Sequence, residues 1–355
     1  MAGVSACAVA LGALCTHLGV PASWIVAFLV SFGAYAILSD RQTTPPPTLM
    51  QPAQVVIAMV CVAPLSQLDG ATVVGYIVPT VLALVVTLAV CAAAAFLLYR
   101  SGAASAVSSL LATLAGGASG MTVLAAELKE DVRFVVLTQY LRMSLVVLTL
   151  PVFVHFFAGG GDEFGGGTSA DGDAPAWWDP GLHPALGALV IWAAVWVTVR
   201  LTRRVVTLPV PYLLLAMLLT WVAGLAGVPD QWLRPEGLVL VLAYAVIGVQ
   251  AGGTLTVSAL RQFSHSLPLI LSAVAAMILG AILAAVLIAY SSGIPLIDAY
   301  LATVPGGIYA VLAFAHDAGS EPIVTVVQVM RTLAMLVIGA YLPTVIGWWG
   351  RRRHT

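Results

Sequence analysis

Long apolar runs recur along the chain and are separated by short polar stretches. Ten of them approach or exceed the roughly 20 residues that a helix needs to cross the hydrocarbon core of a bilayer. They lie at 2–19, 23–39, 53–68, 74–99, 132–157, 183–201, 207–228, 237–257, 267–291 and 322–347. Two further apolar segments, 104–128 and 296–316, are broken by glycine near their centres. The pattern predicts an all-α polytopic membrane protein.

Composition agrees with this class. Of the 355 residues, 61% are hydrophobic and 8% are charged, whereas soluble domains carry about 25% charged residues. The net charge is −1 and the basic residues are dispersed, which argues against a nucleic-acid partner. The Gly- and Asp-rich stretch 159–181 predicts an aqueous linker between two membrane repeats, 1–158 and 182–355. Three consecutive prolines predict a stiff loop at 40–52.

Short matches between the two halves indicate an internal duplication. Three separate places match at a nearly constant offset in residue number, which chance rarely produces. The matching pairs are 56–58 with 246–248, 111–117 with 301–307, and 139–142 with 328–331.

Basic residues indicate the orientation of the spans, because cytoplasmic loops are enriched in Lys and Arg. With the acidic linker outside and both broken segments as re-entrant hairpins, 11 of the 14 basic residues fall on the cytoplasmic side. Arg234 then falls outside, and two arginines lie within the membrane. The charge pattern therefore predicts re-entrant hairpins and cytoplasmic N- and C-termini.

Five crossings in each half is an odd number, so the second half is predicted to be inverted relative to the first. The expected fold is two inverted repeats, each with about five transmembrane helices plus a glycine-tipped re-entrant hairpin. Inverted repeats are characteristic of secondary transporters. One hairpin would enter from the cytoplasm and the other from outside, so that their tips meet near the midplane.

Arg142 and Arg331 each lie about ten residues into a predicted span, roughly 15 Å deep. A charge at that depth costs about 2.5–3.5 kcal/mol on insertion scales, and arginine cannot escape by losing its proton. Gln139 and Gln328 precede them by three residues, which places each Gln–Arg pair on one helix face. Two interpretations stay open. The guanidinium groups bind a carboxylate or phosphate, or they are structural pins paired with an acid or with hairpin carbonyls.

The hairpin turns supply the other candidate substrate contacts. Glycine lets the chain reverse and lets the backbone approach a ligand closely. The helix after each turn points its N-terminus, which favours an anion, toward the midplane. Alternatively, the paired glycines only let helices pack closely. The predicted substrate-binding residues of the turns are Gly116, Gly117, Ser119, Gly120, Pro305, Gly306, Gly307 and Tyr309.

Three titratable residues lie at the ends of the hairpins. Glu127 and Asp317 occupy equivalent places in the two halves, at the same offset as the sequence matches, and His316 adjoins Asp317. Intramembrane acids and histidines often mark proton relays, so coupling to protons is one hypothesis. The same residues fit equally well as interfacial groups in contact with water, or as partners of the two arginines.

No signature of an enzyme is present. A nucleophile elbow, a Walker loop and a dinucleotide fingerprint are all absent from the sequence. The histidines form no metal cluster, and the four cysteines fall within apolar runs without metal-ligand spacing, as small packing residues do. We expect no enzymatic activity, cofactor or metal. The missing Walker loop also argues against an ATP-driven pump in this chain.

Two blocks of the sequence resemble the AbrB-type duplicated membrane protein family, which is distinct from the small DNA-binding regulator of the same name. The residues that carry the resemblance are Gly116-Gly117, Leu124–Glu127, Asp131–Arg133 and Gln139–Arg142, with a second copy in Pro305–Gly307 and Gln328–Arg331. Members are often described as ammonia monooxygenases or as regulators. The resemblance implies a multi-pass protein of the bacterial inner membrane with two related halves.

The first block departs from the family pattern at its turn. Ala115 stands where a proline is expected, and Lys129-Glu130 replaces a pair that commonly resembles Gly-Ala. We therefore expect the first hairpin to turn less sharply than the second, or to use Gly120 for its turn.

Three functions fit these features. The first is a secondary transporter of an anionic substrate, a carboxylate or phosphate, by alternating access at a midplane site. The second is a polyprenyl-phosphate lipid flippase or carrier, in which the same arginines hold the headgroup. The third is a membrane-embedded regulator of gene expression that acts indirectly. The expected partners are a small anion or a lipid phosphate, membrane lipids, and a second copy of the chain in a homodimer.

Overall fold

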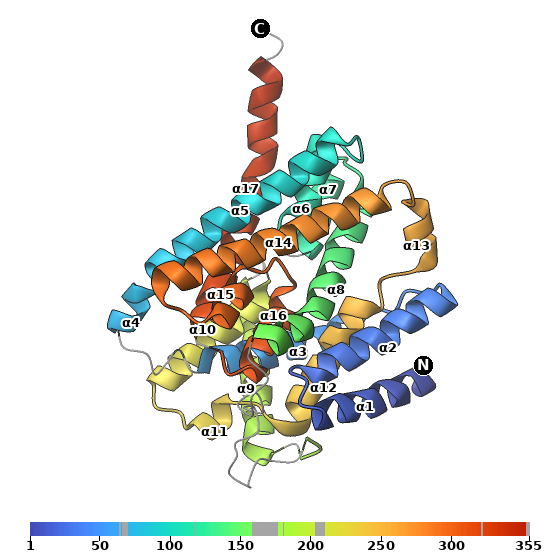
Figure 1. Cartoon of the computed structure of the whole chain (residues 1–355). Helices are drawn as coiled ribbons and strands as arrows, with labels where there is room; N and C mark the ends of the chain where they lie inside the picture. The colour runs from blue at the N-terminus through green and yellow to red at the C-terminus, as the bar shows by residue number, and fades with distance from the viewer. Residues whose placement is uncertain are drawn as a thin grey trace. The chain divides into compact units, whose positions relative to one another are not determined.

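The computed structural model describes residues 1–63, 65, 70–116, 118–157, 177–179, 181–202, 210–320 and 322–352. Within these ranges the regular secondary structure is helical throughout (Figure 1). Some helical stretches are long and apolar enough to cross a membrane. They are Ile77–Arg100, Val132–Val154, Leu182–Thr202, Asp230–Gln262 and Leu267–Ser292. The chain is an all-α polytopic membrane protein, as the apolar runs predict.

Every predicted span contains a helix, but several of these helices are short. They are α1 (Ala2–His17), α2 (Ser23–Ser39), α3 (Pro47–Val62) and α10 (Pro211–Leu225). Their 15 to 17 residues extend about 23–26 Å at 1.5 Å per residue. The total number of crossings therefore stays a prediction.

The start of α3 corrects the loop predicted at 40–52. The helix begins at Pro47, inside the proline-rich stretch, and carries Pro52 in its interior. Proline is well suited to the first helical turn, because the N–H that it lacks has no helical partner there. Pro52 removes one hydrogen bond of the helix. The three consecutive prolines therefore start a helix instead of only forming a stiff loop.

The chain divides into two compact units, and each combines segments from both predicted repeats. The first unit comprises Met1–Ile77, Val147–Val257 and Tyr309–Thr325, and the second comprises Val78–Val146, Ser258–Ile308 and Val326–Thr355. The first contains α1, α2, α3, α4 (Gly70–Gly75), α9 (Leu182–Thr202), α10, α11 (Asp230–Leu233), α12 (Gly237–Gly252) and nearly all of α16 (Ile308–Asp317). The second contains nearly all of α5 (Ile77–Arg100), then α6 (Ala106–Thr113), α7 (Ala118–Glu127), most of α13 (Val257–Gln262), α14 (Leu267–Ser292), α15 (Leu296–Thr303), the first part of α8 (Val132–Phe157) and most of α17 (Ile323–Arg352).

Several helices of the first half have a counterpart in the second half that begins at the offset of the sequence matches. The pairs are α3 with α12, α5 with α14, α6 with α15, and α7 with α16. In the first pair and in the two pairs of short helices, the ends are separated by the same offset as the starts. The starts of these helices therefore recur at the same offset in residue number as the sequence motifs.

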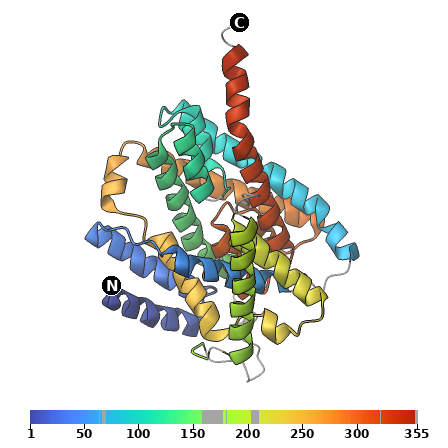
Figure 2. The ribbon, with the colours of Figure 1, turned by 180° about the vertical axis from the view of Figure 1, so that it is seen from behind.

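In the first unit, α12 packs closely against α2, and α1 lies beside α2 (Figure 2). Gly248 and Gly252 of α12 face the backbone of α2. A Cβ atom at Gly252 would lie 2.1 Å from the Leu29 carbonyl oxygen, and one at Gly248 would lie 2.6 Å from that of Ile25. Small residues four apart permit this approach. These glycines are packing residues.

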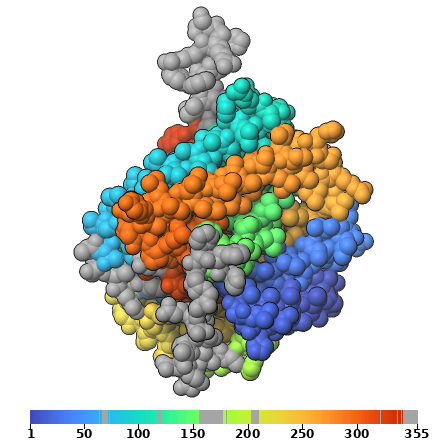
Figure 3. Space-filling view, in the orientation of Figure 1, coloured from blue at the N-terminus to red at the C-terminus, as the bar shows by residue number. Residues whose placement is uncertain are grey.

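In the second unit, α5 and α14 run antiparallel and lie side by side, as the cyan and orange surfaces also show (Figures 1 and 3). They touch at Val90 and Gly280, where an added Cβ atom would lie 2.7 Å from the valine side chain. These two positions are themselves separated by the repeat offset. Equivalent residues of the two halves therefore meet at this crossing.

Candidate functional site

Each glycine-broken segment forms two short helices joined by a turn. α6 and α7 flank the turn that contains 114–116, and α15 and α16 flank the turn at 304–307. Helices of eight and ten residues extend about 12 and 15 Å, half of a bilayer core or less. Gly117 lies outside the described residues, and so does the side chain of Ser119.

The first Gln–Arg pair lies on α8 and binds the carboxyl-terminal end of α6. Gln139 Nε2 donates to the Leu111 and Leu114 carbonyls over 2.7 and 2.9 Å. Arg142 Nη1 donates to the Thr113 carbonyl over 2.7 Å. Arg142 Nη2 donates to Gln139 Oε1 over 2.8 Å. The pair therefore satisfies carbonyl groups that the end of a helix leaves without an intrahelical partner.

The second pair, on α17, repeats this arrangement at the end of α15. Gln328 Nε2 donates to the Leu301 carbonyl. Arg331 Nη1 donates to the Val304 carbonyl over 2.6 Å, and Arg331 Nη2 donates to Gln328 Oε1 over 2.6 Å. A positive charge at a helix C-terminus is also favoured by the helix dipole. The two halves thus hold the carboxyl-terminal ends of α6 and α15 with the same chemistry.

Both guanidinium groups are buried, and neither has an acidic partner among the described residues. The exposed fraction is 4% for Arg142 and 1% for Arg331, and the Nε atom of each lacks a hydrogen-bond partner. Among the described residues, neither arginine forms a salt bridge. The two guanidinium groups repel each other electrostatically. Cys91 of α5, which the sequence presented as a packing residue, lies within electrostatic range of both.

The energies of these hydrogen bonds can be compared with the cost of placing each charge in the membrane. A hydrogen bond from a charged donor contributes about 1.5–3 kcal/mol, and each arginine donates two. Together these offset the about 2.5–3.5 kcal/mol that insertion of the charge costs. The described conformation therefore has the contacts of the structural-pin interpretation. The Nε donor of each arginine still lacks a partner among the described residues, and the two cations still repel each other. A bound anion would accept hydrogen bonds from the Nε donors and reduce this repulsion.

The two turns pack on the long helices of opposite repeats. An added Cβ atom at Gly116 would lie 3.1 Å from Met335 of α17, and one at Gly307 would lie 2.6 Å from Met143 of α8. Pro305 and Gly306 are buried with these turns, and Gly120 is half-buried. Tyr309 opens the part of α16 that belongs to the first unit. The close contacts at Gly116 and Gly307 fit the packing role of the paired glycines.

The titratable residues at the hairpin ends differ between the two halves. Glu127 is exposed at the end of α7. Asp317 is half-buried and accepts hydrogen bonds from the Tyr244 hydroxyl and the Ala22 backbone N–H. His316 is also half-buried. Asp317 therefore has partners of its own within the first unit, and sequence reasoning missed Tyr244 because nothing in its pattern singles it out.

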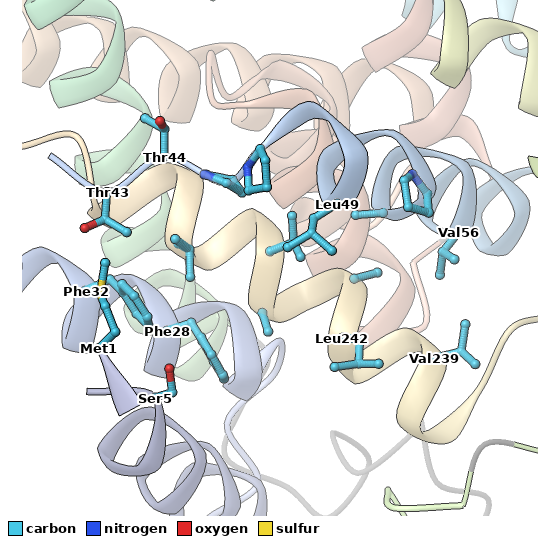
Figure 4. Close-up of a pocket in the computed structure, with 18 residues that line it drawn as sticks. Met1, Ser5, Phe28, Phe32, Thr43, Thr44, Leu49, Val56, Val239 and Leu242 are labelled. Atoms are coloured by element: carbon cyan, nitrogen blue, oxygen red, sulfur yellow. The ribbon is translucent and has the colours of Figure 1, made fainter. Parts of the chain in front are cut away.

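The first unit contains an apolar pocket of about 630 Å³ that the sequence did not indicate (Figure 4). Phe28 and Phe32 of α2 and Leu242 of α12 line it together with residues of α3 and of the loop before it. None of its lining side chains is charged. Its walls come from four helices, α1, α2, α3 and α12, so no single stretch of sequence carries its signature.

Comparison with known proteins gives the family. A family model described as "Transition state regulatory protein AbrB" matches residues 24–350. The chain belongs to the AbrB family. The match includes both hairpins and both Gln–Arg pairs, so the predicted family resemblance is confirmed. This AbrB-family chain is also 25% identical over 252 residues to "Uncharacterized protein YhjN" of Bacillus subtilis (strain 168). That alignment covers 68% of this chain and 64% of the relative.

Proposed function

We propose that this AbrB-family protein is a secondary transporter of a small carboxylate or phosphate, which binds at the two Gln–Arg pairs. The observation that carries the proposal is the burial of Arg142 and Arg331 without a carboxylate partner among the described residues. Arginine presents a planar set of donors that matches carboxylate and phosphate oxygens. A bound anion would accept from the free Nε atoms and relieve the repulsion between the cations.

The arrangement of the second unit also supports a transporter. Antiparallel α5 and α14 touch at Val90 and Gly280, which are equivalent positions of the two halves. Two antiparallel helices that are related by a twofold axis perpendicular to them touch each other at equivalent residues. Such an axis in the membrane plane relates inverted repeats, whose interface commonly holds the substrate site. Alternating access would follow from movement of one helix set against the other.

The proposal includes the bacterial inner membrane as location, with both termini in the cytoplasm and both hairpins re-entrant. Its basis is the distribution of basic residues and the short lengths of the hairpin helices. The regulatory role named in the family description would then be an indirect effect of transport.

Thermal stabilisation of the detergent-purified protein by added anions tests the site. We expect succinate or inorganic phosphate to raise the unfolding midpoint saturably in the wild type. The shift should disappear in Arg142→Gln/Arg331→Gln. It should persist in Arg261→Gln, because Arg261 is an exposed arginine of the same unit. An equal response of the double variant and the wild type would show that the arginines act only as pins.

Cys91 offers a second measurement that keeps both arginines. In a Cys7→Ala/Cys15→Ala/Cys61→Ala background, the rate at which a small methanethiosulfonate reagent modifies Cys91 reports access to the guanidinium groups. We expect the anion that stabilises the protein to slow this modification. Uptake of that anion into proteoliposomes then distinguishes a transporter from a protein that only binds it.

A lipid-phosphate carrier is the second candidate, and the apolar pocket is the observation that favours it. A cavity of about 630 Å³ lined by uncharged side chains suits a hydrocarbon chain. Farnesyl phosphate distinguishes the two candidates in the same thermal assay. Stabilisation by farnesyl phosphate, with no response to succinate or inorganic phosphate, would favour the carrier over the small-anion transporter.

A further inference from the structure

Asp317, the last residue of α16, is held by donors from two other parts of the first unit. The Tyr244 hydroxyl of α12 donates to Oδ1 over 2.6 Å. The backbone N–H of Ala22, which precedes α2, donates to Oδ2 over 3.0 Å. Ala22 has a φ of 49°, a left-handed conformation that is uncommon for a non-glycine residue. We call Asp317, Tyr244 and Ala22 the α16 latch.

Hydrogen bonds, without a salt bridge among the described residues, balance the charge of this carboxylate. The titratable groups around it are Tyr244 of α12, Cys61 of α3 and the adjacent His316. Arg234 lies within electrostatic range of His316, but its salt bridge is with Asp230. A half-buried carboxylate without a cation is a group that a proton can neutralise favourably.

The latch is not a requirement of the hairpin fold. Glu127 occupies the equivalent place on α7, where it is exposed. The first hairpin therefore ends in an acid that faces outward, and the second ends in an acid held by two helices. Packing that both hairpins share does not explain this difference.

We propose that Asp317 is the proton-binding group that couples transport to a proton gradient, and that its protonation opens the α16 latch. One proton from water joins the carboxylate to give a neutral carboxyl group, and no other bond forms. The protonated oxygen becomes a donor, so it loses the hydrogen bond that it accepted, from Ala22 at Oδ2 or from Tyr244 at Oδ1, and the other oxygen remains an acceptor. The end of α16 is then held less tightly against α12 and the residue before α2, and the Tyr244 hydroxyl still lies within hydrogen-bond distance, 3.3 Å, of the Ala313 carbonyl of α16.

The same segment of chain connects the latch to the proposed anion site, so this proposal rests on the proposed function. Arg331 holds the Val304 carbonyl at the start of the turn, and Asp317 ends the helix that follows. α16 has ten residues, about 15 Å at 1.5 Å per residue. The proposed coupling therefore runs along this short helix.

Hydrogen–deuterium exchange of α16 tests the latch without any substrate. After correction for intrinsic exchange, amides of 309–317 in the wild type should exchange faster at mildly acidic than at neutral pH. Asp317→Asn should lose this pH dependence. Glu236→Gln, which alters an exposed acid of the same unit, should retain it. A wild type whose α16 exchange does not change with pH would overturn the proposal.

Transport into proteoliposomes tests the coupling, with succinate and inorganic phosphate as probes. Asp317→Asn should retain exchange of the probe across the membrane at equal pH, and should lose accumulation driven by a pH gradient. Accumulation at the wild-type level in Asp317→Asn, or loss of exchange as well in a folded variant, would contradict the coupling role. If the wild type transports neither probe, the small-anion transporter fails, and the exchange measurement still decides on the latch.

Discussion

At Arg142 and Arg331, the glutamine three residues earlier determines what the buried charge can do. Each glutamine donates to hairpin carbonyls and accepts from its own arginine. This orients the guanidinium group along the end of the short helix and leaves its Nε atom free. The pin and the anion-site interpretations are therefore compatible, because different nitrogen atoms of the same group serve each role.

Replacement of Gln328 tests the structural half of this arrangement. In Gln328→Leu the Leu301 carbonyl and Arg331 Nη2 each lose a partner in a buried place. An unsatisfied buried group costs about 1–3 kcal/mol, so for two such groups we expect a destabilisation of roughly 2–6 kcal/mol. A lower thermal unfolding midpoint in detergent would show it. Gln262→Leu, at an exposed glutamine of α13, should leave the midpoint nearly unchanged, and equal effects of the two variants would contradict the network.

Among the helices, close approach of backbones is the main way in which α2 and α12 associate. Lipid chains are as apolar as the side chains of the helices, so packing must supply the attraction. Gly248 and Gly252 remove the side chains that would keep the two helices apart. This packing also holds Tyr244 and the start of α2 in the unit that contains the α16 latch.

A methyl group at Gly252 should therefore separate the two helices. Its Cβ atom would lie 2.1 Å from the Leu29 carbonyl oxygen, and backbone cannot move aside as a flexible side chain can. Overpacking typically costs about 1–3 kcal/mol, and a lower unfolding midpoint of Gly252→Ala would report it. Gly3→Ala is the matched control, because nothing lies within 4 Å of a Cβ atom there. A Gly252→Ala variant as stable as Gly3→Ala would contradict this packing.

For the whole molecule, the short helices α6, α7, α15 and α16 and the basic residues together predict a topology. If the hairpins do not cross, the linker at 159–181 and the loop that contains Ser264 lie on opposite sides of the membrane. If both hairpins crossed, the same two places would exchange sides. The proposed orientation of the transporter therefore depends on whether the two glycine-broken segments cross the membrane.

Labelling of introduced cysteines distinguishes these topologies. In a background without native cysteines, a membrane-impermeant maleimide should label Ser169→Cys in intact spheroplasts. It should label Ser264→Cys only after the membrane is permeabilised, because the positive-inside distribution places that loop in the cytoplasm. The reverse pattern would contradict the proposed topology, in which both hairpins are re-entrant and both termini are cytoplasmic.

The sequence determined the fold class, the helix breaks and the residues of the Gln–Arg pairs. A bilayer core lacks water, so each spanning segment must satisfy its own backbone groups. The local pattern of apolar residues and glycines therefore predicts the helices well. It failed at α3, where Pro47 begins the helix, because proline suits a first helical turn as well as a loop.

Packing between distant segments determined the rest. The sequence placed Gln139 and Arg142 on one face, and only the fold shows that they meet the end of α6. Equivalent sequence positions made Glu127 and Asp317 look alike, but one is exposed and the other is held by Tyr244 and Ala22. Local periodicity specifies the face of a helix on which a residue lies. The partner that meets this face depends on contacts between segments far apart in the chain, which no local pattern records.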